Sequence, residues 1–296
     1  MRVRKAVIPT AGFGTRFLPV TRSVPKVMLP VLDVPGIHYI VQEACDAGIE
    51  HLTFVVSQGQ EAIARYFDRF TDLELALERQ GKKEMLDLMR SITTMAEISF
   101  VYQKEQKGLG HAVLTARPNV GNEPFAVFLP DDVIWSDSPT IGKMIDVASH
   151  YNGCVIAVKE VPDEAVPNLG IVNPRPLTDD ISEIVGMVEK PPLDKAPSNL
   201  AIIGRYVLMP EVFDQLENVK PGAVGEIQLT DAIAGLLKTQ KAYAYRFGGD
   251  HFDLGTPVGM LKASIYAALQ REGMAGEIAR WISENVPNAE MAAASD

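Results

Sequence analysis

The chain has 296 residues, of which 47% are hydrophobic and 22% are charged, and its formal net charge is −10. This is the composition of a globular protein with a substantial core, and its acidic balance argues against a general nucleic-acid binder, which normally presents a basic face. No apolar run approaches the ~18 residues that a membrane span needs, and the first residues predict no secretory signal. Cys45 and Cys154 form no CxxC pair and are typical of buried thiols in a reducing compartment, so we expect a cytoplasmic protein.

The first half of the chain alternates between short β-rich runs and segments with helical spacing. Strands are predicted at 5–9, 51–56, 98–102, 125–129 and 154–159, and helices at 37–48, 60–70, 73–92 and 140–151. Such alternation predicts an α/β fold of the Rossmann-like, three-layer kind, with a mixed, mostly parallel central sheet. Because ligands bind at the carboxyl ends of parallel strands, we expect the loop at Gly12 and the turn after Leu129 to share one edge.

Beyond residue 151 the sequence pattern changes, because prolines cluster between short strand-like runs. Strands are predicted at 170–172, 184–188 and 201–208, and helices at 227–237, 257–269 and 275–285. We interpret this half as the rest of the same sheet, a small antiparallel layer and C-terminal helices. The predicted organisation is one domain over 1–256, a helical portion over 257–288 and a frayed tail over 289–296.

The first strand runs into a glycine-rich turn, Ala11-Gly12-Phe13-Gly14-Thr15-Arg16, and Pro25-Lys26 follows. Glycine lets the backbone approach a ligand closely, and consecutive free N–H groups form an anion-binding concavity. Phe17 stands where a dinucleotide fingerprint needs its third glycine, and no Gly-Lys-Ser/Thr run of a Walker loop follows. The turn therefore predicts a polyphosphate site with Arg16 and Lys26 beside it, and an ordinary strand–turn–helix corner is the alternative.

Further candidates follow other predicted strands. Asp131 and Asp253 are carboxylates of the kind that Mg²⁺ takes from a protein, although Asp-rich turns and helix caps give the same pattern. Lys190, between Glu189 and Pro191, offers a point charge for a phosphate, or is an exposed strand-end lysine. Gln103, ahead of Gly108, has an amide that suits a pyrimidine edge, or is simply solvated. Asn199, the Gly204-Arg205-Tyr206 run and the 226–231 block add polar groups suited to sugar hydroxyls, and strand edges and helix starts carry the same residues.

Taken in order, these motifs resemble a known family. Gly12-Phe-Gly-Thr-Arg with Pro25-Lys26, Gly108-Leu-Gly-His-Ala, Leu129-Pro-Asp-Asp, Glu189-Lys-Pro, 196–208 and Gly225-Glu-Ile-Gln-Leu-Thr-Asp are similar to those of the bacterial UTP–glucose-1-phosphate uridylyltransferases, within the sugar-nucleotide pyrophosphorylase group. The match spans residues 5 to 270. It implies a nucleotidyltransferase fold, an enzyme that joins UTP and glucose 1-phosphate with Mg²⁺, and a homo-oligomer, dimer or tetramer, that uses the helices beyond Pro257 as the subunit contact.

The resemblance also implies roles for particular residues. Ala11, Gly12, Gly14, Thr15, Gln103 and Gly108 would bind the nucleotide; Arg16, Lys26 and Lys190 would be catalytic; Gly170, Glu189, Lys190, Asn199 and Glu226 would bind the sugar phosphate; Asp131 and Asp253 would hold Mg²⁺. Three positions depart from the usual pattern, namely Phe13 for leucine, Val27 for glutamate and Thr256 for asparagine.

Three other functions remain alternatives at this point. The same chemistry with another nucleotide or hexose 1-phosphate would need the same motifs. A non-catalytic sugar-nucleotide sensor would keep the pocket, and the full set of Arg16, Lys26, Asp131, Lys190 and Asp253 argues against it. The missing third glycine argues against a nucleotide-binding oxidoreductase.

Overall fold

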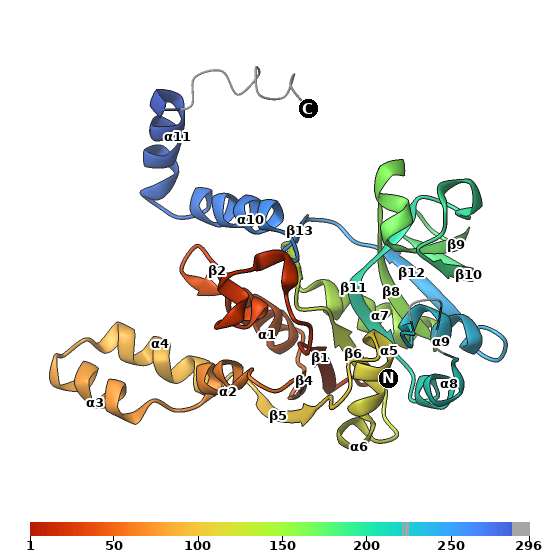
Figure 1. Cartoon of the computed structure of the whole chain (residues 1–296), viewed down its shortest axis with the longest axis horizontal. Helices are drawn as coiled ribbons and strands as arrows, with labels where there is room; N and C mark the ends of the chain where they lie inside the picture. The colour runs from red at the N-terminus through yellow and green to blue at the C-terminus, as the bar shows by residue number, and fades with distance from the viewer. Residues whose placement is uncertain (221, 223–224, 286–296) are drawn as a thin grey trace.

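The computed structural model describes residues 1–220, 222 and 225–285. Its centre is a nine-stranded sheet in the order β5-β4-β1-β6-β11-β8-β12-β10-β9 (Figure 1). In chain order these strands are β1 (Lys5–Pro9), β4 (His51–Val56), β5 (Glu97–Tyr102), β6 (Phe125–Phe128), β8 (Cys154–Glu160), β9 (Gly170–Pro176), β10 (Ile181–Glu189), β11 (Leu200–Leu208) and β12 (Ala242–Arg246). The mixed sheet that the sequence predicts is therefore present.

Parallel pairing in this sheet is confined to part of it. Strands β5, β4, β1 and β6 are mutually parallel, as are β8 and β12. The remaining pairs, including both neighbours of β11, are antiparallel. Since β1 pairs in parallel with β6, the loop after Pro9 and the turn after Phe128 lie at the same edge, as the sequence predicts.

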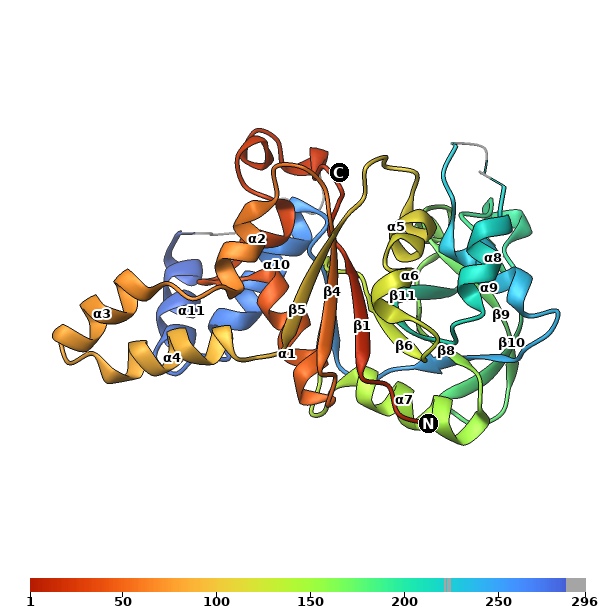
Figure 2. The same ribbon diagram turned by 90° about the horizontal axis from the view of Figure 1, so that it is seen from below.

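Helices cover both faces of the sheet and form the outer two layers (Figure 2). One face packs against α1 (Gly36–Asp46), α2 (Glu61–Phe67) and α7 (Thr140–Tyr151), and the other against α5 (Leu109–Thr115), α6 (Arg117–Val120), α8 (Val212–Asn218) and α9 (Leu229–Leu236). The longer of these helices place an apolar stripe on the sheet, because their apolar residues recur every three or four positions. On α1 this stripe is Ile37, Ile40, Val41 and Ala44, all fully buried.

The segment predicted as one helix over 73–92 is two helices, α3 (Thr71–Arg79) and α4 (Lys83–Thr93), which project from the body (Figure 1). Gly81 adopts the left-handed conformation with φ 67°, and its N–H donates to the carbonyl of Glu78. A glycine in this conformation ends a helix and reverses the chain, which the apolar periodicity alone does not reveal. The break at Gly81 therefore corrects the predicted single helix.

Two small two-stranded sheets complete the described fold. Strand β7 (Asp132–Trp135) pairs antiparallel with β13 (Asp250–Asp253), and β2 (Pro30–Val31) pairs with β3 (Val34–Pro35). The sequence predicts an antiparallel layer, but it does not predict strands β7, β12 and β13. Helix α10 (Pro257–Leu269) has the predicted bounds and α11 (Met274–Asn285) begins one residue early. The predicted frayed tail over 289–296 lies outside the described residues. Within 1–220, 222 and 225–285, the helices all fall short of the length and apolarity that a bilayer crossing demands.

Candidate functional site

The glycine-rich turn leaves β1 with its backbone N–H groups free. Thr10 fixes the end of the strand, because its N–H and its hydroxyl both donate to the carbonyl of Val55, at 2.8 and 2.9 Å. From Ala11 to Arg16, no backbone N–H donates to another residue in the described part of the chain. A β-carbon at Gly12 would meet nothing within 4 Å, so this stretch of backbone opens onto a cavity. The turn has the free donors that an anion site requires.

Gly14 holds this turn against Lys26. Its φ of 63° is left-handed, and a β-carbon there would lie 2.9 Å from Cβ of Lys26. Gly14 and Thr15 therefore shape the turn, and neither lines the two cavities described below. Lys26 begins a short 3-10 helix, and the next residue, Val27, is buried in the core beside α1. Val27 also lines the cavity at this turn, beside Lys26, so the departure places an apolar side chain where a glutamate would place a charge.

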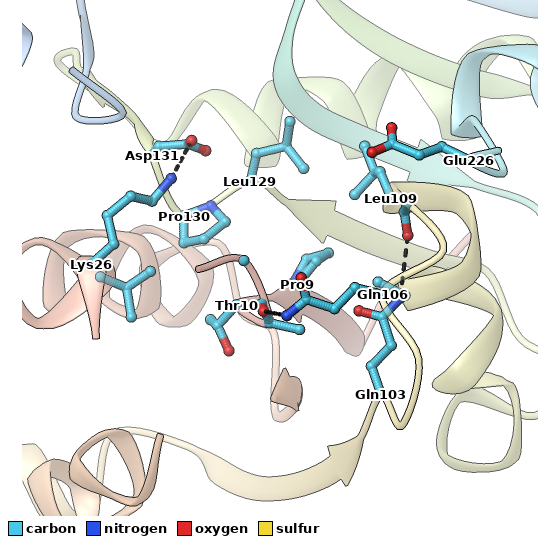
Figure 3. A pocket seen from close by; sticks show the side chains of 15 residues that line it. Pro9, Thr10, Lys26, Gln103, Gln106, Leu109, Leu129, Pro130, Asp131 and Glu226 are labelled. Carbon is cyan, nitrogen blue, oxygen red and sulfur yellow. Dashed lines mark hydrogen bonds and ion pairs between the residues drawn. The ribbon is translucent and has the colours of Figure 1, made fainter. Parts of the chain in front are cut away.

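A cavity of about 360 Å³ opens at the carboxyl ends of β1, β5 and β6 (Figure 3). The glycine-rich turn forms one wall and the loop from Gln103 into α5 forms another. Its lining includes seven of the residues singled out in the sequence, namely Ala11, Gly12, Lys26, Gln103, Gly108, Asp131 and Glu226. Gln106, which the sequence analysis missed, crosses between the walls and donates from Nε2 to the carbonyl of Ala11 at 2.6 Å.

Gln103 lies at the floor of this cavity and is 6% exposed. Its Nε2 contacts the carbonyl of Gly108 at 3.3 Å and Nδ1 of His111 at 2.9 Å. Burial lowers the pKa of His111, so the ring is neutral near pH 7 and its Nδ1 can accept. In the His111 tautomer protonated at Nε2, both amide hydrogens of Gln103 are engaged, and Oε1 is left as an acceptor.

A second cavity, of about 770 Å³, adjoins the first. It contains Arg16, Gly170, Glu189 and Asp253 among the predicted residues, and it shares Leu109, Leu129 and Asp131 with the first cavity. Strand pairing brings part of this cavity's lining together. Gly170 of β9 pairs with Glu189 of β10, and the next residue of β9, Ile171, pairs with Ala201 of β11. Thr230, at the start of α9, donates to Oε2 of Glu189 at 2.6 Å. The two cavities thus meet at Asp131.

Pairing of β7 with β13 brings the predicted metal carboxylates together. Asp253 lies opposite Asp132 in this sheet, and the N–H of Leu254 donates to the carbonyl of Asp131 at 2.6 Å. Asp131 Oδ2 lies 2.7 Å from Nζ of Lys26. Asp132 is engaged differently, by Nε2 of His251 at 2.6 Å and by the N–H of Gly204 at 3.1 Å.

The electrostatics of Asp253 indicate a place for a cation. Loss of solvent raises the pKa of Asp253, the N–H of Gly255 lowers it, and the negative charges of Asp132 and Asp131 raise it further. A carboxylate whose ionised form is disfavoured by like charges gains from a nearby positive ion. Lys26 supplies part of that charge in this structure.

The residues present fit Mg²⁺ held with a bound phosphate. A β-carbon at Gly255 would lie 2.7 Å from Oδ1 of Asp253 and 3.1 Å from Oδ2 of Asp131, so the two oxygens converge on one point that a side chain would fill. The described residues contain no group of three or more His, Cys, Asp or Glu side chains suited to a metal. Mg²⁺ commonly takes one or two carboxylates and completes its shell with water and phosphate oxygens, which is the donor set available here.

Three predicted sugar-phosphate residues lie elsewhere than in the second cavity. Glu226 lines the first cavity instead. Lys190 follows β10 with its side chain 56% exposed and Nζ 3.8 Å from Oε1 of Glu189, and Asn199 is exposed just before β11. Lys190 has a φ of 47°, in the left-handed region that few residues with a side chain adopt; Leu32 and Asn152 also adopt it.

Arg205, expected among the sugar-reading groups, is instead fully buried and paired with Glu43 of α1. The sequence analysis does not single out Glu43, which flanks the apolar stripe of α1 three residues after Ile40. Thr256, one of the departures, accepts from the N–H of Gly259 at 3.1 Å and caps α10 at the rim of the second cavity. Phe13, another departure, is 73% exposed.

Comparison with known proteins extends these observations. A family model described as nucleotidyl transferase matches residues 5–269. A Staphylococcus haemolyticus protein named UTP–glucose-1-phosphate uridylyltransferase is 47% identical over 283 residues, which are 96% of this chain and 98% of that protein. A UDP-glucose pyrophosphorylase solved with UDP-glucose is 40% identical, with a TM-score of 0.83, over 91% of this chain and all of that one. A UTP-bound UGPase from Acinetobacter baumannii is 40% identical, with a TM-score of 0.86, over 96% of this chain and all of that one.

Proposed function

Because this chain belongs to the nucleotidyl transferase family, we propose that it transfers a uridylyl group from UTP to glucose 1-phosphate, which gives UDP-glucose and pyrophosphate. The observation that carries the proposal is that the two cavities meet at Asp131. The first cavity contains the amide of Gln103, which can read a base, and the second contains the carboxylate of Asp253, which lies beside Asp131. A phosphate oxygen of glucose 1-phosphate attacks the α-phosphorus of UTP and forms the new P–O bond. The bond from that phosphorus to the bridging oxygen breaks, and pyrophosphate leaves on the opposite side.

The first cavity supports uracil as the base. Oε1 of Gln103 is an acceptor, because His111 and the carbonyl of Gly108 engage both of its amide hydrogens. The N3–H of uracil or thymine would donate to this oxygen, whereas N3 of cytosine is an acceptor and would face it without a proton. The backbone of Ala11 and Gly12 forms the opposite wall, where the free N–H groups suit the triphosphate.

Charge neutralisation is the main catalytic requirement, because two anions must meet. At ~4 Å a pair of like charges repels by ~1 kcal/mol in water and by more in a drier site. Lys26 and Arg16 lie on either side of Asp131, one in each cavity. Asp131 and Asp253 would hold Mg²⁺, which would supply further positive charge to the phosphates. Transfer of this kind depends mostly on positioning and on charge stabilisation, so the chain needs no nucleophile of its own.

The second cavity supports binding of the sugar phosphate. The hydroxyl of Thr230 fixes one oxygen of Glu189 and leaves the other to accept from a sugar hydroxyl. Gly170 lies against the same carboxylate, since a β-carbon there would be 3.1 Å from Oε2 of Glu189. Lys190, in its strained conformation at the end of β10, has a flexible side chain that can reach the phosphate.

We further propose that the protein is a cytoplasmic homo-oligomer that binds neither nucleic acid nor a membrane. Both cysteines are free thiols, and the net charge is strongly negative. The portion over 257–288 is the proposed subunit contact. Within its described part, large apolar side chains are exposed along α10 and α11, namely Val258, Leu261, Ile265, Leu269, Met274, Trp281 and Ile282. Sedimentation equilibrium measures the subunit number directly, and a strictly monomeric protein would contradict this part of the proposal.

The activity is tested by pyrophosphate release from UTP, dTTP, CTP and GTP with glucose 1-phosphate, with and without Mg²⁺. We expect UTP to be the best substrate, with turnover that requires the metal. Galactose 1-phosphate and mannose 1-phosphate, each given with UTP, test the sugar. A preference for dTTP would assign a thymidylyl transfer with the same chemistry. Binding of UDP-glucose without pyrophosphate release would indicate a sensor.

A further inference from the structure

Arg205 is the largest side chain that the described core encloses completely. Its guanidinium donates from Nε and Nη2 to Oε2 of Glu43 at 2.9 and 2.8 Å, and it lies 4.9 Å from the centre of the Phe128 ring. A buried ion pair is weak evidence for stability, because apolar residues of similar volume often replace it without loss. Its presence therefore calls for another explanation.

The third guanidinium nitrogen points to that explanation. Nη1 of Arg205 donates to the carbonyl of Gly204 at 3.0 Å and to the carbonyl of Leu129 at 3.4 Å. Leu129 opens the turn that carries Asp131. The same strand contacts this turn twice more, because the N–H of Leu129 donates to Gly204 at 2.8 Å and the N–H of Gly204 donates to Asp132. Residues 204 and 205 of β11 thus hold the turn at 129–132, which carries Asp131 and Asp132, by hydrogen bonds.

Glu43 of α1 connects Arg205 of β11 to helix α7. Its Oε2 binds Arg205, and its Oε1 accepts from the N–H of Ile141 at the start of α7 at 3.2 Å. Asp131 is consequently held from two sides. The carbonyl of Asp131 accepts from the N–H of Leu254, the residue that follows β13. On the other side, Arg205 donates to the carbonyl of Leu129, two residues before Asp131.

We propose that the Arg205–Glu43 pair is a positioning device that sets the carboxylate of Asp131 against that of Asp253 for a divalent cation. This inference depends on the proposed metal site at these two residues. The pair touches neither cavity, so it acts only through the turn. Groups that orient a metal ligand in this way are typically worth ~10-fold or more in metal affinity.

The test is calorimetric titration with UTP, without glucose 1-phosphate, in Mg²⁺ and in EDTA. The informative quantity is the ratio of the two UTP affinities. The double variant Glu43→Gln with Arg205→Met removes both charges and keeps an acceptor for Ile141. We expect it to bind UTP in EDTA as the wild type does and to lose ~10-fold of the Mg²⁺-dependent gain.

A matched control removes another ion pair far from the turn. Glu74 is buried between Arg69 and Arg90 of the α3–α4 projection, and Glu74→Gln should leave the Mg²⁺-dependent gain intact. Circular dichroism checks that each variant is folded. Arg205→Lys, which keeps the charge and loses the planar fork, serves if the double variant does not fold, and it should lose part of the gain.

The outcomes separate the inference from the metal site. A wild-type Mg²⁺ gain in the double variant, or in Arg205→Lys where that is the variant that folds, would refute the positioning role alone. An equal loss in EDTA and in Mg²⁺ would also refute it, because the nucleotide pocket itself would then be distorted. If Mg²⁺ gives the wild-type protein no gain, both the metal site and this inference are wrong.

Discussion

Replacement of Gln103 by leucine tests the base-reading part of the site. Leucine has a similar size but neither an acceptor for N3–H of uracil nor donors for Gly108 and His111. Gln103 is 6% exposed, so water cannot easily replace the lost partner. We expect Gln103→Leu to bind UTP more weakly and to turn it over less efficiently.

The magnitude follows from the number of groups left unpaired. A buried donor that loses its acceptor costs about 1–3 kcal/mol, which corresponds to about 5- to 150-fold in kcat/KM for UTP. If Gln103 reads the base, N3 of cytosine would face the Gln103 oxygen acceptor to acceptor in the wild type, and this mismatch would be absent in the leucine variant. The ratio of kcat/KM for UTP to that for CTP should therefore fall as well.

Steady-state pyrophosphate release with UTP and with CTP measures both effects. Gln42→Leu is the matched control, because Gln42 is exposed on α1 and donates to Asp46 on the same helix, away from both cavities. The control should have wild-type kinetics. An unchanged UTP-to-CTP ratio in Gln103→Leu would refute the assignment of Oε1 as the base-reading acceptor, even if overall activity fell.

Three further substitutions test the phosphate and metal groups. Lys190→Ala should raise KM for glucose 1-phosphate and lower kcat, together by ~10-fold or more, because a charged hydrogen bond to phosphate is lost; unchanged kinetics would remove Lys190 from the site. Asp131→Asn should abolish most activity at ordinary Mg²⁺ concentrations, and wild-type rates without any divalent ion would contradict the two-carboxylate assignment. Folding raises the pKa of Asp253 above 3.8, chiefly through loss of solvent. The protonated form is therefore favoured in the folded protein, and the stability that this proton contributes is fully present below pH 3.8. That stability is lost as the pH rises through the pKa of the folded protein. Asp253→Asn should therefore melt at a higher temperature than wild type at pH 7 in EDTA, with a difference that shrinks toward pH 4, and a lower melting temperature at pH 7 would contradict this reasoning.

Features that depend on neighbouring residues were predictable from the sequence. The first strand, the glycine-rich turn and helices such as α10 follow from local periodicity and from the backbone freedom of glycine. The parallel arrangement of β1 and β6 then placed Gly12 and Asp131 at one edge. Local features were not all predicted: Gly81, whose left-handed backbone divides an apparently continuous helix, is one example, and helix α8 is another.

Tertiary structure alone decided the features that depend on distant pairing. Asp253 reaches Asp131 only because β13 pairs with β7 from a remote part of the chain, and short strands carry little periodic signal of their own. The same residue types acquired different roles through burial: Arg205 lies inside the core against Glu43, whereas Arg16 faces a cavity. Glu226 likewise lines the first cavity because the loop before α9 packs on Gly108. The local sequence determines which polar side chains each strand end and turn carries. The free-energy cost of burying a polar group without a partner determines which of these side chains come together in the folded protein.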